Sequence, residues 1–369
     1  MADSISLART DRYGRIGTGL NARVRLTDMK RRDVLAGAGT ATIAALAGCA
    51  DASGLFARPT PDGVYVPDHV EGMEMVGAAS LGDIRVGVTY SYPHRFWTVD
   101  RDGDAYDTNL TPVEDDDTIH LMAVPWDGET GLVLPNTGLS VEIERGGDLV
   151  SQEVIYPMLS QRMGFHYGAN FPLDGDGTYD VTVSVGGLSI QRYGGFEGRV
   201  DTAAEATIPL EFSADTLAGI PYRSLEDRRF QAGAVDPMSM DALPTGYAPE
   251  SLPGATLGRG TSGDAAFLGS VVTADRFGPD PYLALSAHTP YNGLVIPGMG
   301  LSASVDGADP VGLDAAIDPA LGFHYGRSIP ELAPERTVEV TVDVPPQVAR
   351  HVGYETAFLE MPPFTLTPA

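Results

Sequence analysis

Histidines and methionines are the side chains of this sequence that could bind a transition metal. One short motif holds two of the histidines, because Gly164-Phe165-His166-Tyr167-Gly168 returns as Gly322-Phe323-His324-Tyr325-Gly326. Imidazole and thioether ligands are typical of copper sites, and imidazole also suits zinc and iron. These residue types therefore point to metal binding. The seven histidines are His69, His94, His120, His166, His288, His324 and His351.

Four residues in the first half of the chain form a candidate ligand set. His120 and Met122 lie two positions apart in an alternating segment, so both side chains point to one side of a strand. Met158 and His166 bracket a loop that we expect to end in the glycine-flanked turn. If strand and loop converge, the set suits Cu(I), with zinc, iron and Cu(II) as alternatives. The other interpretation is that the methionines fill the core and the histidines form ordinary hydrogen bonds. Nearby candidates of lower weight are Met73, Met75 and His94.

The charge of the chain excludes several classes of partner. It contains 50 acidic and 24 basic residues, for a formal net charge of −26, which repels nucleic acids and phosphate groups. Lys30 is the only lysine, and acidic residues gather in turns such as Glu114–Asp117. This surface resembles those of proteins from high-salt environments, where salt screens the repulsion; an ordinary acidic secreted protein is the alternative. The common motifs of hydrolases and nucleotide enzymes are missing, so we expect no enzymatic activity.

Residues 1–49 have the features of an N-terminal extension and a lipoprotein signal peptide. We expect Met29 to be the initiator, because two arginines then precede an apolar run that is too short to span a bilayer. The paired arginines resemble a twin-arginine signal, and Leu46-Ala47-Gly48-Cys49 resembles a lipobox. Cys49, the only cysteine, is the predicted lipidation site, with residues 50–63 as a tether. These features predict a protein anchored to the outer face of the cell membrane; a chance cysteine is the alternative.

Alternating apolar and polar residues predict an all-β first domain at residues 64–213. This pattern, interrupted by turns rich in glycine, proline and aspartate, is typical of an antiparallel β-sandwich. Residues 214–263, which lack a sustained period, are interpreted as a linker or extended segment. The alternating segments are Ile84–Tyr90, Ile119–Val124, Leu139–Ile143, Tyr179–Val185 and Ala206–Phe212.

Residues 264–369 repeat short blocks of the first domain in the same order. Gly131–Pro135 is similar in sequence to Gly293–Pro297, and Asp180–Val183 is similar to Glu339–Val342. Matched blocks in a constant order indicate a tandem duplication. We therefore expect a second β-sandwich that is a degenerate copy of the first.

The first domain resembles the bacterial periplasmic iron-transport protein family. The resemblance rests on Ile119-His120-Leu121, on Pro157-Met158 and on His166-Tyr167-Gly168-Ala169-Asn170, and it extends more weakly into the second domain. It implies immunoglobulin-like β-sandwiches that dimerise and bind copper, in some cases zinc, with a role in iron uptake. The resemblance therefore implies one of two assemblies for this chain, and the first is a homodimer. The other is an internal pseudo-dimer, in which the two domains share ligands across their interface.

The first domain departs from the family pattern at three places. Met122 stands where the family has a metal-binding glutamate, which makes the site softer and favours Cu(I). Met163-Gly164-Phe165 replaces an Asp-Gly-Pro sequence before the loop histidine. Arg192-Tyr193 replaces an Arg-His pair, so a tyrosine stands at the position of the fourth family ligand.

The second domain departs differently. Tyr282 occupies the position of His120, and no methionine precedes His324 at the right distance. His324 and Arg350-His351 still match the family. We therefore expect at most a two-histidine remnant of His324 with His351, with His288 as a displaced third ligand.

Two functions of different classes follow. The first is a lipid-anchored extracytoplasmic protein that captures copper or iron and delivers the ion to a membrane permease or reductase. The second is a surface structural or interaction protein of two immunoglobulin-like domains without a metal, because a fold does not determine a function. The predicted metal ligands are His120, Met122, Met158, His166, His324 and His351.

Overall fold

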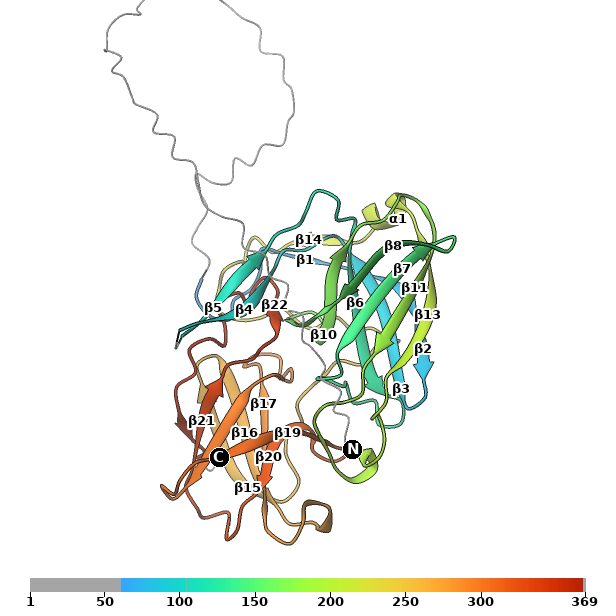
Figure 1. Cartoon of the computed structure of the whole chain (residues 1–369). Coiled ribbons are helices and arrows are strands. Elements are labelled where there is room, and N and C mark those ends of the chain that lie inside the picture. Colours follow the sequence, from blue (N-terminus) through green and yellow to red (C-terminus); the bar gives the residue numbers. More distant parts are fainter. Residues whose placement is uncertain (1–60, 104, 368–369) are drawn as a thin grey trace, which may run out of the picture. The chain divides into compact units, whose positions relative to one another are not determined.

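Antiparallel β-sheet dominates the fold, which confirms the prediction of an all-β chain built from β-sandwiches (Figure 1). The structure is a computed structural model that describes residues 61–103 and 105–367. The predicted signal peptide and the lipidation site Cys49 lie outside the described residues. Within them, no helix is long and apolar enough to cross a membrane.

The N-terminal sandwich consists of two sheets. Tyr90 and Phe212 meet between them with ring centroids 6.1 Å apart. The larger sheet has the order β2 (Glu74–Leu81), β3 (Ile84–Ser91), β6 (Ile119–Asp127), β10 (Gly164–Phe171), β9 (Tyr156–Ser160), β22 (Ala349–Arg350), β4 (Phe96–Asp102), β5 (Ala105–Thr111). The smaller sheet has the order β13 (Ala204–Phe212), β11 (Gly177–Val185), β7 (Leu139–Arg145), β8 (Asp148–Val154).

The C-terminal sandwich forms one continuous hydrogen-bonded sheet. Its first strand, β15, lies inside residues 214–263, where Gly258 and Gly260 interrupt the alternation that would have marked a strand. The order is β15 (Ala255–Ser262), β16 (Ala265–Val272), β17 (Tyr282–His288), β20 (Gly322–Ser328), β19 (Val311–Asp318), β18 (Gly300–Val305), β21 (Val338–Val344), β23 (Phe364–Thr365), and β12 (Gln191–Arg192) pairs with β19.

Short elements complete the fold. β1 (His69–Glu71) pairs with β14 (Tyr222–Ser224), which brings a segment before the first sandwich beside one after it. α1 (Ala214–Ala218) is a single helix of five residues. Two 3₁₀ turns are η2 (Gly194–Phe196) and η3 (Asp275–Phe277).

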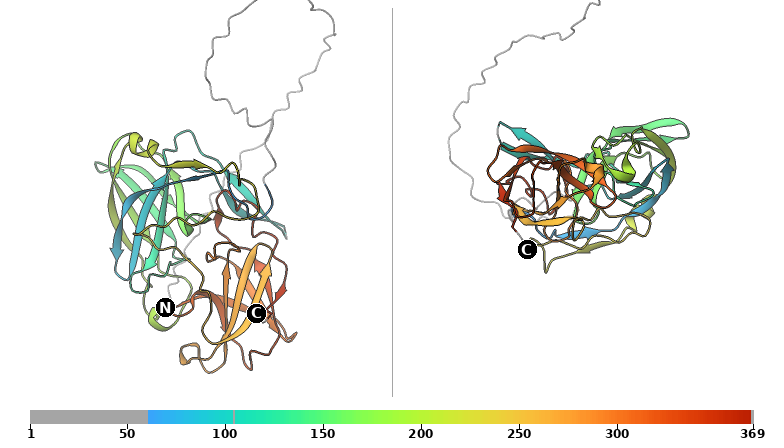
Figure 2. Two further views of the ribbon diagram at one scale, coloured as in Figure 1. Left: turned by 180° about the vertical axis from the view of Figure 1, so that it is seen from behind. Right: turned by 90° about the horizontal axis from the view of Figure 1, so that it is seen from below.

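Each half of the chain contributes a two-residue strand to the other half. β22, from the C-terminal end, pairs in parallel with β9, and it appears in red beside the cyan strands β4 and β5 (Figure 1). β12, which lies between β11 and β13 of the first sandwich, pairs in parallel with β19. Figure 2 shows the blue to green and the orange to red strands from two further sides. The exchange places Arg350 and its neighbour His351 in the N-terminal half.

Strand β6 is buried along its whole length, because both of its faces are covered. Leu121 lies opposite Tyr90 of β3 and therefore faces the smaller sheet. His120 and Met122 alternate with Leu121 and face the other way. The outer face of the larger sheet is thus the surface on which the candidate ligands lie.

Candidate metal centre

Strand register brings the predicted ligands of the first domain together. On β10, His166 lies opposite Met158 of β9, and Asn170 lies opposite His120 of β6. The Gly-Phe-His-Tyr-Gly motif is therefore the start of a strand, and our interpretation of it as a turn was wrong. In a strand the two aromatic residues of the motif share one face, and the histidine takes the other.

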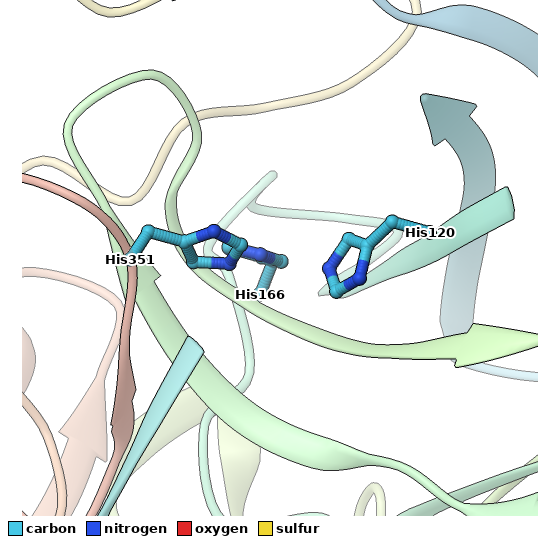
Figure 3. Close-up of side chains that lie close together, drawn as sticks. All are labelled: His120, His166 and His351. Atoms are coloured by element: carbon cyan, nitrogen blue, oxygen red, sulfur yellow. The ribbon is translucent and has the colours of Figure 1, made fainter. Parts of the chain in front are cut away.

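Three histidines converge on the outer face of this sheet (Figure 3). The ligand atoms of His120, His166 and His351 all lie within 4.8 Å of one another. His120 and His166 are fully buried in the strands β6 and β10. His351 directly follows β22, so it reaches the cluster from the C-terminal end of the chain.

Hydrogen bonds fix the two buried imidazoles in the tautomer that a metal needs. Asn170 Oδ1 accepts the backbone N–H of His94 (3.1 Å), so it also accepts from His120 Nδ1 (2.7 Å). The Gly164 carbonyl accepts from His166 Nδ1 at 3.0 Å. Both protons therefore sit on Nδ1, and both Nε2 atoms keep a free lone pair. These Nε2 atoms are buried and have no hydrogen-bond partner, which is costly unless a ligand is bound.

Burial keeps these imidazoles neutral. Removal from water lowers the pKa of His120 and of His166 to about 3. Burial and the neighbouring histidines also lower the pKa of His351 well below its usual value. Because a metal binds the neutral imidazole, no proton has to leave these residues when a metal binds near neutral pH.

A thioether completes the cluster. Met158 is fully buried, and its Sδ lies 3.3 Å from His351 Nε2. Gly168 leaves open the space into which the ligands point, because a Cβ atom there would lie 2.9 Å from His120 Nε2 and 3.1 Å from Met158 Sδ. Three imidazoles and one thioether form a borderline-to-soft set that suits copper.

We expect the substitution Gly168→Ala to weaken metal binding about 10- to 100-fold, a loss typical when the groups around a metal site are displaced. The added methyl group would occupy the space between His120 Nε2 and Met158 Sδ. Isothermal titration measures the change in affinity. Gly312→Ala is the control, since a Cβ there meets nothing within 4 Å. Equal affinity of both variants and the unmodified protein would contradict this geometry.

His324 lies in a different environment, and the predicted pairing of His324 with His351 is wrong. Its Nδ1 bonds to the Gly322 carbonyl at 3.0 Å, as His166 bonds to Gly164. Its Nε2, however, lies 3.0 Å from the Tyr282 hydroxyl. Tyr282 occupies the position that corresponds to His120. Its hydroxyl donates a hydrogen bond to His324 Nε2 and so occupies the lone pair that a metal would use.

Three further residues lie away from the cluster or at its edge. Tyr193 packs against Phe277 and Tyr282 of the C-terminal half, so it does not act as a fourth ligand beside His120. His288 is half-buried and bonds to the Thr289 carbonyl. Met122, almost fully buried, lines the cavity beside the cluster.

The sequence interpretation missed the role of Asn170 and gave His94 too little weight. Asn170 holds the His120 ring and both backbone polar groups of His94. The ring of His94 lies 4.8 Å from that of His120, measured between centroids. Asn170 was visible in the motif that ends at this residue, but its role depends on the register of β6 and β10.

The chain belongs to a family of undetermined function. The sequence profile described as "Domain of unknown function (DUF7350)" matches residues 73–199 and 250–367. A comparison with curated proteins finds no sequence match.

Solved structures of two bacterial proteins are among those similar to part of the chain. A copper-bound variant of FetP from uropathogenic Escherichia coli strain F11 has 20% identity and a TM-score of 0.30, covering 38% of this chain and 97% of that one. FetP from the same strain, as isolated, has 15% identity and a TM-score of 0.28, with 39% and 96% covered. A copper-bound variant of Campylobacter jejuni P19 has 15% identity and a TM-score of 0.27, with 39% and 96% covered.

Proposed function

We propose that this protein captures a copper or iron ion outside the cytoplasm and delivers it for uptake. The observation that carries the proposal is the pair of buried, unpartnered Nε2 atoms of His120 and His166, with His351 beside them. The soft ligand Met158 favours copper, and Cu(I) above all. The role is binding and release rather than catalysis.

The remaining parts of the proposal rest on the sequence. Cys49 is the proposed lipid anchor, and a membrane permease is the proposed acceptor of the ion. The motif that ends at Asn170 resembles periplasmic iron-transport proteins, which supports a location on the outer face of the membrane. We also propose that the two sandwiches arose by duplication and act as an internal pseudo-dimer, in which β22 supplies His351 to the first sandwich.

The test is the metal content of the purified protein in near-molar salt. After incubation with Cu(I) or Fe(II) and dialysis, we expect about one ion per chain, because one histidine cluster within residues 61–103 and 105–367 offers free lone pairs. His120→Ala and His166→Ala each remove a ligand and should abolish retention. His288→Ala removes an imidazole outside the cluster and should retain the ion.

Two results would contradict the proposal. One is a metal content of the unmodified protein at the background level. The other is a fall in thermal stability of His166→Ala with no change in metal content. The second result would favour the alternative of a surface interaction protein in which His166 serves only packing.

A further inference from the structure

A cavity of about 640 Å³ opens beside the histidine cluster. Its wall includes His351 of the cluster and Met122 of β6. Among the other lining residues, His69, Glu71 and His94 carry imidazole or carboxylate groups that bind cations. None of these three belongs to the cluster of His120, His166 and His351. Their arrangement raises the question of how an ion reaches ligands that are fully buried.

Four side chains form a continuous polar row, and three of them line this cavity. Asp68 Oδ1 lies 2.6 Å from His69 Nδ1, and Glu71 Oε1 lies 3.2 Å from His69 Nε2. The other oxygen of Glu71 lies 3.6 Å from His94 Nε2. Carboxylate and imidazole groups thus alternate along the row, and each group lies within 3.6 Å of the next.

The row runs from solvent to the buried cluster. The Asp68 side chain is 48% exposed, whereas those of Glu71 and His94 are 14% and 24% exposed. The ring centroid of His94 lies 4.8 Å from that of His120 and 5.6 Å from that of His351. His94 therefore touches the cluster on one side and Glu71 on the other.

The position of His94 is fixed by the same residue that orients a ligand. Asn170 accepts from the His94 backbone N–H, donates to the His94 carbonyl at 2.9 Å and accepts from His120 Nδ1. His94 and His120 are thereby held together although they come from different segments. A loop residue held in this way is suited to act on the same ion as His120.

A hydrated cation cannot reach the fully buried Nε2 atoms while it keeps its water shell, because a charge in an apolar environment is costly unless ligands replace the water. Stepwise exchange of water for protein ligands lowers this cost. The Glu71 carboxylate supplies negative charge, and the His94 imidazole supplies a neutral ligand. The row provides both in the order that an incoming cation would meet them.

We propose that Glu71 and His94 form the transfer route by which a transition-metal cation passes between solvent and the His120–His166–His351 cluster. This inference rests on the proposed function. Glu71 attracts the cation at the cavity, and His94 passes it to His120 and His351. Both residues touch the ion in transit and are not ligands of the final site.

The test is stopped-flow measurement of Cu(II) binding, with Cu(II) added as its glycine complex and tryptophan fluorescence as the signal. Trp97 is paired with Arg350, the residue before His351 in the sequence, in the pairing of β4 with β22, so bound Cu(II) should quench it. Glu71→Gln removes the charge and keeps the shape. His94→Phe keeps a ring and removes the nitrogen ligand.

A residue that contacts the ion only in transit affects the free-energy barrier between solvent and the cluster. A change in this barrier alters metal association and metal dissociation by the same factor. We expect each variant to lower the association and dissociation rate constants together, roughly 10-fold, the lower end of the effect that local charge has on association. The equilibrium dissociation constant should then stay within about twofold. Glu153→Gln, an exposed residue of β8, makes the same charge change elsewhere and should leave both rates unchanged.

Two results would overturn the transfer route while leaving the metal site intact. Unchanged rates in both variants would show that the row is an ordinary ion-pair network. Weaker equilibrium binding with faster dissociation would make His94 a ligand of the final site. Failure of the unmodified protein to bind copper would instead remove the proposed function, and the equilibrium experiment detects that result separately.

Discussion

We expect His351→Ala to abolish metal retention, or to weaken it by at least about 100-fold, which exceeds the loss typical of a change in the outer shell of a metal site. The residue belongs to the part of the sequence predicted to form the second domain, yet its imidazole lies with those of His120 and His166. Without it, the cluster keeps two imidazoles and the Met158 thioether. Metal analysis after dialysis and titration with Cu(I) measure the change.

The matched control for this variant is His324→Ala. His324 is also a buried histidine of the C-terminal half, and burial lowers its pKa to about 4. Its Nε2 lies against the Tyr282 hydroxyl instead of an open ligand position. His324→Ala should therefore lower thermal stability and leave metal retention unchanged. Loss of metal in both variants, or in His324→Ala alone, would contradict the assignment of His351 to the site.

Much of the N-terminal fold was predictable because its strands have one face in the core. The segment Tyr179–Val185 alternates strictly, and it lies within β11, where every second residue is buried. Ala206–Phe212 lies in the same way within β13. In such strands the period of two directly records which face meets the opposite sheet.

The strand β10 was missed because its signal looks like a turn. Gly164 has a φ of +69°, and Gly322 has a φ of +67°, so glycine at the start of each motif indeed ends a tight turn. Between the glycines, however, Phe165 and Tyr167 alternate with His166, which is a strand pattern of only three residues. A motif this short cannot separate the turn from the strand that follows it.

Local sequence patterns predicted the ligands that come from neighbouring strands of one sheet, but they did not predict the ligand that comes from the other half of the chain. His120, Met158 and His166 come from neighbouring strands of one sheet, so the expectation that they converge was sound. His351 was assigned to His324 because both match the family pattern within the predicted second domain. The parallel pairing of β22 with β9 reverses this assignment, and only two residues make that pairing. No local pattern specifies so short a long-range contact.

Arg350 holds the segment that carries His351, and its replacement should have the second large effect. The side chain is fully buried, and burial lowers its pKa to about 10. Its guanidinium donates to the carbonyls of Val348 at 2.7 Å, Ala357 at 3.0 Å and Pro346 at 3.2 Å. All three acceptors lie in the segment around His351, so one side chain fixes the shape of that segment.

Arg350→Met keeps much of the side-chain volume and removes every donor. Three buried carbonyls lose a partner, and each such loss costs about 1–3 kcal/mol. We therefore expect the free energy of unfolding to fall by at least about 3 kcal/mol in denaturant titrations. Metal affinity should fall as well, because His351 directly follows Arg350 and depends on the same segment for its position.

Arg350→Lys separates the effect on stability from the effect on the site. Lysine keeps the positive charge but lacks the planar fork that reaches three acceptors at once. We expect it to fold and still to bind metal more weakly than the unmodified protein. Arg336→Met, at an exposed arginine paired with Asp306, should change neither property. If Arg350→Lys binds metal with full affinity, then the position of His351 does not depend on the three guanidinium hydrogen bonds, and the pairing of β22 with β9 and β4 alone must hold the histidine in place.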